Sequence, residues 1–218
     1  MKVFFEERDI EFISNHVSSI DDRFTRRIIW GNLWQMVRDN ALSPLWYLEL
    51  VEKYTDYEDD PTVLQAQMLQ KSTGIKTNYL IDENKKIWSS RLYSLAYKNL
   101  EKGQNDQFQI SWFNLLFSCA ETDSELSDLK FILNGDIIFD HLEVDQEKRW
   151  NIVTKLCAYG DSCFEDLIKI ETENDPGDLG EKRAFTARVS VPNLDLKRKF
   201  WKIFVSKSQE HSTAHLTY

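Results

Sequence analysis

The stretch TDSELSDLKFILNG, residues 122–135, contains the signals of a complete helix. Thr122 followed by Glu125 forms a capping box, in which each side chain satisfies a backbone N–H at the start of a helix. Three leucines then recur at helical spacing and share one apolar face, namely Leu126, Leu129 and Leu133. Gly135 follows as a residue that adopts the left-handed conformation without strain. The stretch therefore predicts one amphipathic helix with both of its ends marked.

Similar signals recur along the chain and divide it into about eleven helical segments. An apolar stripe precedes the first caps and consists of Ile10, Ile13, Val17 and Ile20. Helix starts are predicted at Asp21 or Asp22, Ser43-Pro44, Asp60-Pro61, Asp145 and Asn193. Helix ends are predicted near Gly103, Gly135, Gly160 and Asp175-Pro176, and the helix that ends near Gly103 is expected to begin at about Asn84.

Helix breakers are scarce, which favours helices over strands. The chain has seven Gly and four Pro, whereas all-β proteins use many tight turns. Residues 136–142 are the one segment in which a short strand or an extended loop competes. Serial helical hairpins without a heptad pattern predict an all-α fold, an α-solenoid that forms a HEAT-like superhelical bowl, although no strict repeat period is visible. We interpret residues 1–218 as a single domain.

Composition and charge argue against several classes of protein. A hydrophobic fraction of 42% can fill a core, so global disorder is not expected. The net charge of −9 repels phosphate backbones, which argues against nucleic acid as a partner. The longest run without a formal charge, residues 107–120, is shorter than the roughly 18 apolar residues that a membrane helix needs. The N-terminus turns acidic at Glu6 and lacks the apolar core of a signal peptide, so we expect a cytoplasmic protein.

The four histidines do not form a zinc motif. A zinc peptidase needs two histidines one helical turn apart with a glutamate between them as general base. His16 and His141 have no histidine at that spacing. His211 and His215 do, but Ser212 stands where the glutamate must be, so a solvated tail is the better interpretation.

Other candidate sites also favour structural roles. Three cysteines lack metal-ligand spacing and are interpreted as inert thiols of a reducing compartment, namely Cys119, Cys157 and Cys163. The acidic runs 57–60 and 171–175 could chelate a cation, but each borders a proline at a helix junction, where capping explains it better. Trp30 and Trp34 have the helical spacing of core residues. No nucleophile elbow or phosphate loop occurs, so we assign no catalytic, cofactor-binding or metal residue, and substrate-binding residues stay unknown.

Three blocks of sequence resemble the C-terminal helical domain of aminopeptidase N-type zinc metallopeptidases. The first is RRIIWGNLWQMVRD at residues 26–39, with an arginine, W-x-x-x-W and a final Arg-Asp, followed by Leu42 and Tyr47-Leu48. The second is LEVDQEKRW at residues 142–150, which matches an L-x-V-D…R-W signature. The third is a spaced set, Asp175, Gly180, Ala187-Arg188, Pro192, Lys197 and Trp201. The order and spacing of these blocks agree with the family across nearly the whole chain.

The resemblance implies a fragment of a larger multidomain aminopeptidase, cut before the family's last helices. The parent would remove N-terminal amino acids from peptides, with zinc bound through the H-E-x-x-H motif of an upstream catalytic domain of the same polypeptide. This chain would cap the catalytic cleft, limit substrate access and contribute peptide-binding surface. The resemblance also assigns packing roles to Trp30, Trp34 and Trp150. Pairing with carboxylates or helix-end carbonyls is expected of Arg26, Arg38 and Arg149.

A second function from another class stays open at this point. A stand-alone helical-repeat scaffold could bind a protein or peptide partner on its concave face. An H-E-x-x-H motif upstream in the same open reading frame would favour the peptidase, and its absence would favour the scaffold. An independent hydrolase has little support, because no nucleophile–base set is visible.

The missing glutamate between His211 and His215 leads to a prediction about the isolated chain. We expect no hydrolysis of aminoacyl chromogenic amides and no stoichiometric zinc after dialysis, because general base and third ligand are both missing. Metal analysis and an activity assay on the purified chain test this. One zinc per chain together with amide hydrolysis would contradict it.

Overall fold

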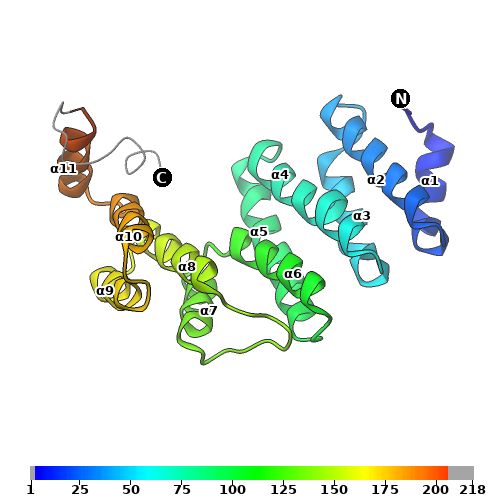
Figure 1. The fold of residues 1–218 in the computed structure, drawn as a ribbon. Coiled ribbons are helices and arrows are strands. Elements are labelled where there is room, and N and C mark those ends of the chain that lie inside the picture. The colour runs from blue at the N-terminus through cyan, green and yellow to red at the C-terminus, as the bar shows by residue number, and fades with distance from the viewer. Residues whose placement is uncertain (1–2, 206–218) are drawn as a thin grey trace. The chain divides into compact units, whose positions relative to one another are not determined.

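The structure is a computed structural model, and residues 3–205 are described. In this range the chain forms eleven α-helices and no strand (Figure 1). The predictions of an all-α fold and of about eleven helices are therefore confirmed.

The helices follow one another with short connections. The first six are α1 (Glu7–His16), α2 (Arg23–Arg38), α3 (Pro44–Tyr54), α4 (Gln70–Asn78), α5 (Asp82–Leu100) and α6 (Asp106–Cys119). The next five are α7 (Asp123–Asn134), α8 (Gln146–Ala158), α9 (Phe164–Asn174), α10 (Asp178–Ser190) and α11 (Leu194–Val205). Short 3-10 turns at Val17–Ser19 and Thr55–Tyr57 extend α1 and α3, and a π-helical segment, Val63–Leu69, precedes α4.

The capping box at the start of α7 forms as predicted. The Thr122 hydroxyl accepts a hydrogen bond from the Glu125 N–H, and the Glu125 carboxylate accepts one from the Thr122 N–H at 2.9 Å. Gly135 follows α7 in the left-handed conformation, with φ at 80°. The other predicted starts are also confirmed, since backbone N–H groups donate to the side chains of Asp22, Ser43, Asp60, Asp145 and Asn193. Of the two alternatives at the start of α2, the structure selects Asp22.

Two boundaries differ from the sequence pattern. Helix α5 begins at Asp82 and ends at Leu100, and a turn then leads to Gly103, whose φ is 60°.

Residues 136–142 form an irregular loop and not a strand. The described residues contain no second strand with which this segment could pair, so the extended-loop alternative holds.

The chain divides into two compact units. Unit 1 comprises residues 1–121 and 139–142, and unit 2 comprises residues 122–138 and 143–218. The superhelical bowl and the single domain over residues 1–218 concern the arrangement of both units together, and they stay predictions.

In unit 1, helices pack against near neighbours in sequence. Helix α2 contacts α3 and the π-helical segment, which in turn contacts α6, and α6 packs along α5 (Figure 1). The largest fully buried side chains of this core include Trp30, Tyr47, Leu48, Leu64 and Trp112. Local packing of this kind is what helical hairpins in series produce.

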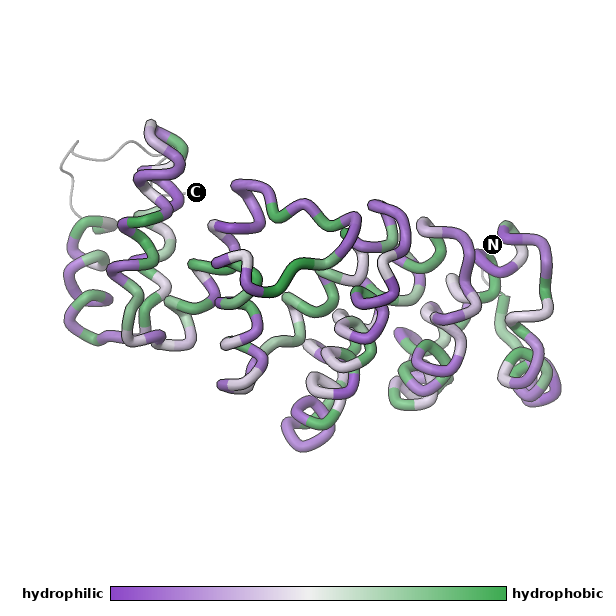
Figure 2. Tube along the Cα trace, turned by 90° about the horizontal axis from the view of Figure 1, so that it is seen from below, coloured by the Kyte–Doolittle hydropathy of each residue, from purple (hydrophilic) through white to green (hydrophobic). Residues whose placement is uncertain are grey.

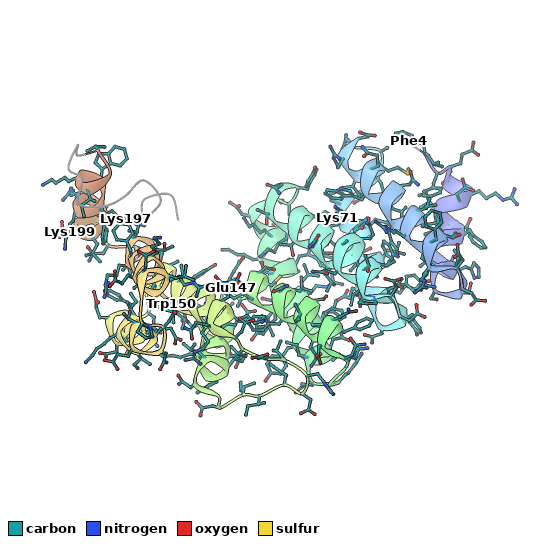
Figure 3. The ribbon with its side chains drawn as sticks, viewed as in Figure 1. Phe4, Lys71, Glu147, Trp150, Lys197 and Lys199 are labelled. Carbon is teal, nitrogen blue, oxygen red and sulfur yellow. The ribbon has the colours of Figure 1, made fainter. Side chains whose placement is uncertain are left out.

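In unit 2, α8 is the central helix. It contacts α7, α9 and α10, and it contributes Trp150, which is labelled in Figure 3. Along the helices, hydrophilic and hydrophobic residues alternate in short groups, as expected when one face of each helix is buried (Figure 2).

The buried tryptophans make the core assignment testable. Trp30 and Trp150 are 1% and 2% exposed, whereas Trp201 is 68% exposed. Trp30→Ala and Trp150→Ala should each lower the free energy of unfolding by about 3–5 kcal/mol, because each leaves a large cavity. Trp201→Ala is the matched control and should change it by about 0.5 kcal/mol or less. Urea denaturation measures all three, and equal midpoints for the buried variants and the unmodified chain would show that the core is misassigned.

Candidate functional site

The tryptophans of the first block surround one buried tyrosine. Trp30 and Trp34, on successive turns of α2, contact Tyr47 edge-on, with ring centroids 5.6 and 6.3 Å away. The Tyr47 hydroxyl donates to the Gln67 carbonyl oxygen in the π-helical segment, and burial raises the pKa of Tyr47. Trp34 is half-buried, and the ammonium of Lys71, labelled in Figure 3, lies over its ring. The block therefore joins α2, α3 and the segment before α4.

Arg26 lies in the first turns of α2 and connects it to segments on both sides. Its guanidinium binds both carboxylate oxygens of Glu58, at 2.7 and 3.0 Å, and pairs with Asp59. Its Nη1 donates to the carbonyl oxygens of Ile20 and Asp21, at 2.8 and 3.1 Å. The hydrogen bond to Glu58 is the largest cause that raises the pKa of Arg26 above its ordinary value. We call this set the Arg26 network.

In unit 2, Arg149 likewise connects its own helix, α8, to neighbouring helices. Its Nε and Nη2 donate to the two carboxylate oxygens of Glu171 on α9, at 2.7 and 2.8 Å. Its Nη1 donates to the Leu133 carbonyl oxygen near the end of α7, at 2.8 Å, and Gln146 Nε2 donates to Glu171 at 2.7 Å. Glu171 is 1% exposed, so its charge depends on these donors for stabilisation. We call this set the Arg149 network.

Asp175 joins α8 to α10 beside the Arg149 network. Its Oδ2 accepts hydrogen bonds from Trp150 Nε1 at 2.8 Å and from Arg183 Nη1 at 3.2 Å. Gly180 packs directly against the same residue, because a Cβ there would lie 1.9 Å from the Asp175 carbonyl oxygen. Only glycine fits this approach, so the third block holds α10 close to the end of α9.

The two arginines occupy equivalent positions. Each lies four residues after the aspartate that caps its helix, Asp22 for Arg26 and Asp145 for Arg149. Hydrogen bonds from the Thr25 hydroxyl and N–H lower the pKa of Asp22. Desolvation raises the pKa of Asp145, but the hydrogen bonds from its own helix outweigh it and the pKa is lowered. Asp22 and Asp145 are therefore ionised at the starts of the helices that carry Arg26 and Arg149.

The full chain matches a known family. Residues 1–218 match the model of the ERAP1-like C-terminal domain. The chain belongs to this family. It is also 27% identical over 209 residues to "Aminopeptidase N" of Streptomyces lividans, an alignment that covers 95% of this chain and 24% of that protein. The chain thus spans about a quarter of the length of this curated relative.

In this ERAP1-like domain, the residues of the three blocks have structural contacts. Packing roles are confirmed for Trp30 and Trp150, and pairing is confirmed for Arg26 and Arg149. Arg38 is exposed, and no carboxylate or carbonyl partner is found for it within residues 3–205, so its pairing stays a prediction. Arg38 is the last residue of α2 and lies at the surface.

Carboxylates of the two acidic runs, residues 57–60 and 171–175, pair with Arg26 and Arg149. In the first run, Glu58 and Asp59 pair with Arg26, and Asp60 accepts the N–H of Val63. In the second run, Glu171 pairs with Arg149. The sequence indicated capping and arginine pairing, but it held no local signal for which carboxylate belongs to which arginine.

The two histidines within residues 3–205 lie on separate segments. The His16 ring contacts that of Phe12 on α1, and His141 Nδ1 lies 3.5 Å from an Asp106 carboxylate oxygen. His211 and His215 lie outside the described residues. Within residues 3–205 no three His, Cys, Asp or Glu side chains are grouped so that they could hold a metal ion, and a zinc site does not fit this range.

One apolar hollow borders α11. It has a volume of about 590 Å³ and is lined by Val189, Leu194, Lys197, Arg198, Phe200, Trp201 and Lys202. Lys197, labelled in Figure 3, donates to the Val189 carbonyl oxygen at 2.7 Å and so caps α10. The lining holds no carboxylate, thiol or imidazole that could act in catalysis.

None of the helices between residues 3 and 205 combines the length and apolarity that a transmembrane span requires.

The Arg149 network yields a stability prediction. Arg149→Met should lower the free energy of unfolding by about 3–5 kcal/mol, because it leaves the Glu171 charge buried without its main partner. Adding Glu171→Met should restore most of that loss, since an apolar pair of similar size needs no charge compensation.

Arg188 is the matched control for this prediction. It pairs with Glu165 at 3.6 Å, and both side chains are exposed to water. Arg188→Met should cost about 1 kcal/mol or less. Thermal denaturation of the unmodified chain and of the three variants tests this. A double variant as unstable as Arg149→Met would show that the unpaired charge of Glu171 does not cause the loss of stability.

Cys157 yields a prediction about pH. Burial raises the pKa of its thiol to about 12. The same thiol titrates near pH 8.5 in an unfolded chain, so above that pH only the unfolded state loses the proton. The free energy of unfolding should therefore fall as pH rises from about 8.5 towards 12, by up to about 1.4 kcal/mol per pH unit from this group.

The Cys157→Ala variant isolates this contribution. Urea denaturation at about pH 8 and pH 10 should show a smaller loss of stability for Cys157→Ala than for the unmodified chain. Cys163 is exposed, and Cys163→Ala should retain the full pH dependence. An identical pH dependence in all three chains would refute the assigned role of Cys157.

Proposed function

We propose that this chain is the non-catalytic C-terminal domain of a zinc-dependent aminopeptidase that removes N-terminal amino acids from peptides. The observation that carries the proposal is the match of residues 1–218 to the ERAP1-like C-terminal domain. The similarity to about a quarter of a protein named Aminopeptidase N supports it. In this proposal, the partner of the domain is an upstream catalytic domain of the same polypeptide.

The contacts of the described residues agree with a supporting role. The signature arginines and tryptophans are occupied by helix packing and by buried carboxylates. The described residues do not fit a zinc site. Zinc and the residues that bind it would therefore belong to the catalytic domain, and we assign no step of the reaction to residues of this chain.

The domain would act by covering the catalytic cleft. A helical domain that closes over a cleft excludes water and limits the size of the peptide that enters. It would also present peptide-binding surface that short substrates do not reach. Its effect is therefore expected on long peptides more than on a single aminoacyl group.

The test compares the full-length parent enzyme with a variant that lacks residues 1–218. The substrates are an aminoacyl chromogenic amide and a peptide of about ten residues. Removal of the domain should change kcat/KM for the peptide at least about tenfold relative to the amide, because only the peptide reaches this domain. Activity on the amide shows that the catalytic domain remains folded.

If the shortened enzyme is inactive on both substrates, the separate 218-residue chain is added in trans. Restored activity on both supports the domain assignment, and no restoration contradicts it. An unchanged ratio of the two kcat/KM values in an active shortened enzyme would refute the role in covering the cleft. A parent enzyme that keeps full activity after chelation would refute the zinc assignment.

A further inference from the structure

The helix that follows Asp60 contains one widened turn. Residues 61–78 are helical without a break, and within them the segment Val63–Leu69 is π-helical. In a π-helix an N–H group pairs with the carbonyl oxygen five residues earlier in place of four, as the Gln70 N–H does with Gln65. The π-helical segment therefore holds one residue more than an α-helical turn in the same place would.

The buried side chains explain why this turn is wide. Val63 and Met68 lie five residues apart, as do Leu64 and Leu69, and all four are 3% exposed or less. An α-helix turns by about 100° per residue, so side chains five residues apart would point about 140° away from each other. A turn that is closed by bonds over five residues places them one above the other instead. The wide turn therefore keeps both apolar pairs in the core of unit 1.

Tyr47 on α3 contacts the backbone of the π-helical segment. Its hydroxyl donates to the Gln67 carbonyl oxygen, and its side chain is 0% exposed. Trp30 and Trp34 on α2 contact the Tyr47 ring edge-on and hold it in position. A buried hydroxyl without a partner costs free energy. The bond therefore favours the one placement of the wide turn that aims the Gln67 carbonyl oxygen at Tyr47.

Helix α4, which continues from the π-helical segment, depends on the rotation that the segment sets. Lys76 is 4% exposed, and its Nζ donates to the Ser118 carbonyl oxygen and to Glu121, both at 3.0 Å. The ammonium of Lys71, labelled in Figure 3, lies 5.6 Å from the centre of the Trp34 ring. If the extra residue moved past these positions, both side chains would turn by about 100° about the helix axis and lose these contacts.

An extra residue in a helix is not fixed by the helix itself. It can occupy one turn or the next, because the backbone forms about the same number of hydrogen bonds in either case. Contacts from outside the helix must select its place. We propose that the Tyr47 hydroxyl is a lock that keeps the extra residue within Val63–Leu69 and so fixes the rotation of α4 about its axis. The lock lies within unit 1 and does not depend on the proposed peptidase.

The first test is Tyr47→Phe in the 218-residue chain, followed by native-state amide hydrogen exchange. Without the hydroxyl the extra residue can migrate. The N–H groups of residues 68–72 should therefore exchange at least about fivefold faster relative to those of α5 and α6, which report the opening of unit 1 as a whole. An unchanged relative rate would overturn the lock.

Tyr54→Phe is the matched control for this exchange measurement. Tyr54 also lies on α3, and its hydroxyl donates to the Ser14 carbonyl oxygen at 2.8 Å. Tyr54→Phe therefore removes a bond of the same kind that does not touch the π-helical segment. The relative exchange rate of residues 68–72 should stay as in the unmodified chain, and an acceleration equal to that of Tyr47→Phe would overturn the lock.

A deletion tests the extra residue directly. Removal of Ala66 from the π-helical segment should leave an ordinary α-helical turn with α4 at the same rotation. The chain should still unfold cooperatively, with a Tm changed by about 4 °C or less. Ser94 is exposed within α5, which is α-helical throughout, so its deletion should rotate the rest of α5 and abolish the cooperative transition. A deletion of Ala66 as damaging as that of Ser94 would overturn the proposal.

The two changes combined distinguish a lock from a hydrogen bond that only adds stability. In the chain without Ala66 there is no extra residue to migrate, so Tyr47→Phe should no longer speed the relative exchange of residues 68–72. Equal acceleration with and without Ala66 would overturn the proposal. If Tyr47→Phe alone prevents folding, the deletion of Ala66 should restore it, and a combined variant that also fails to fold would overturn the lock.

Discussion

A carboxylate that is taken out of water needs a partner, and for Glu58 and Glu171 that partner is an arginine four residues into a helix. Glu171 is almost completely buried, and Arg149 binds both of its oxygens while it also binds the carbonyl oxygen of Leu133. One guanidinium therefore sets the positions of α7, α8 and α9. Trp150, the next residue, extends the constraint to α10 through Asp175. The arrangement is demanding, because removal of either charge leaves the other buried alone.

In unit 1 a buried carboxylate is paired with an arginine in the same way, by different residues. Arg26 follows a capping aspartate at the same interval, binds both oxygens of Glu58 and donates to carbonyl oxygens before its helix. Helical hairpins in series have few long-range contacts, so each unit needs some interaction that fixes one hairpin against the next. Arginine suits this role because its planar fork reaches a carboxylate and a carbonyl oxygen at once. Arg26 and Arg149, which lie in the blocks that resemble the family, thus have a common physical role in packing.

Much of this fold could be predicted from the sequence, because its signals are local. The caps at Thr122, Asp145 and Asn193 and the stop at Gly135 depend on residues within one helical turn. The partners Glu58 and Glu171 lie 32 and 22 residues from their arginines, and no periodicity identifies them. The packing of Phe139 against Tyr97 was also not predicted, since an apolar residue in a loop gives no sign of where it packs.

The central claim is that Arg149 and Glu171 hold the helices together and take no part in catalysis. The most direct measurement is kcat of the full-length parent enzyme on a small aminoacyl amide after Arg149→Met with Glu171→Met. This double variant removes both charges and keeps an apolar pair in their place. We predict an unchanged kcat at temperatures below the unfolding midpoint of the variant. A loss of kcat of tenfold or more in an enzyme whose Tm is unchanged would contradict the claim.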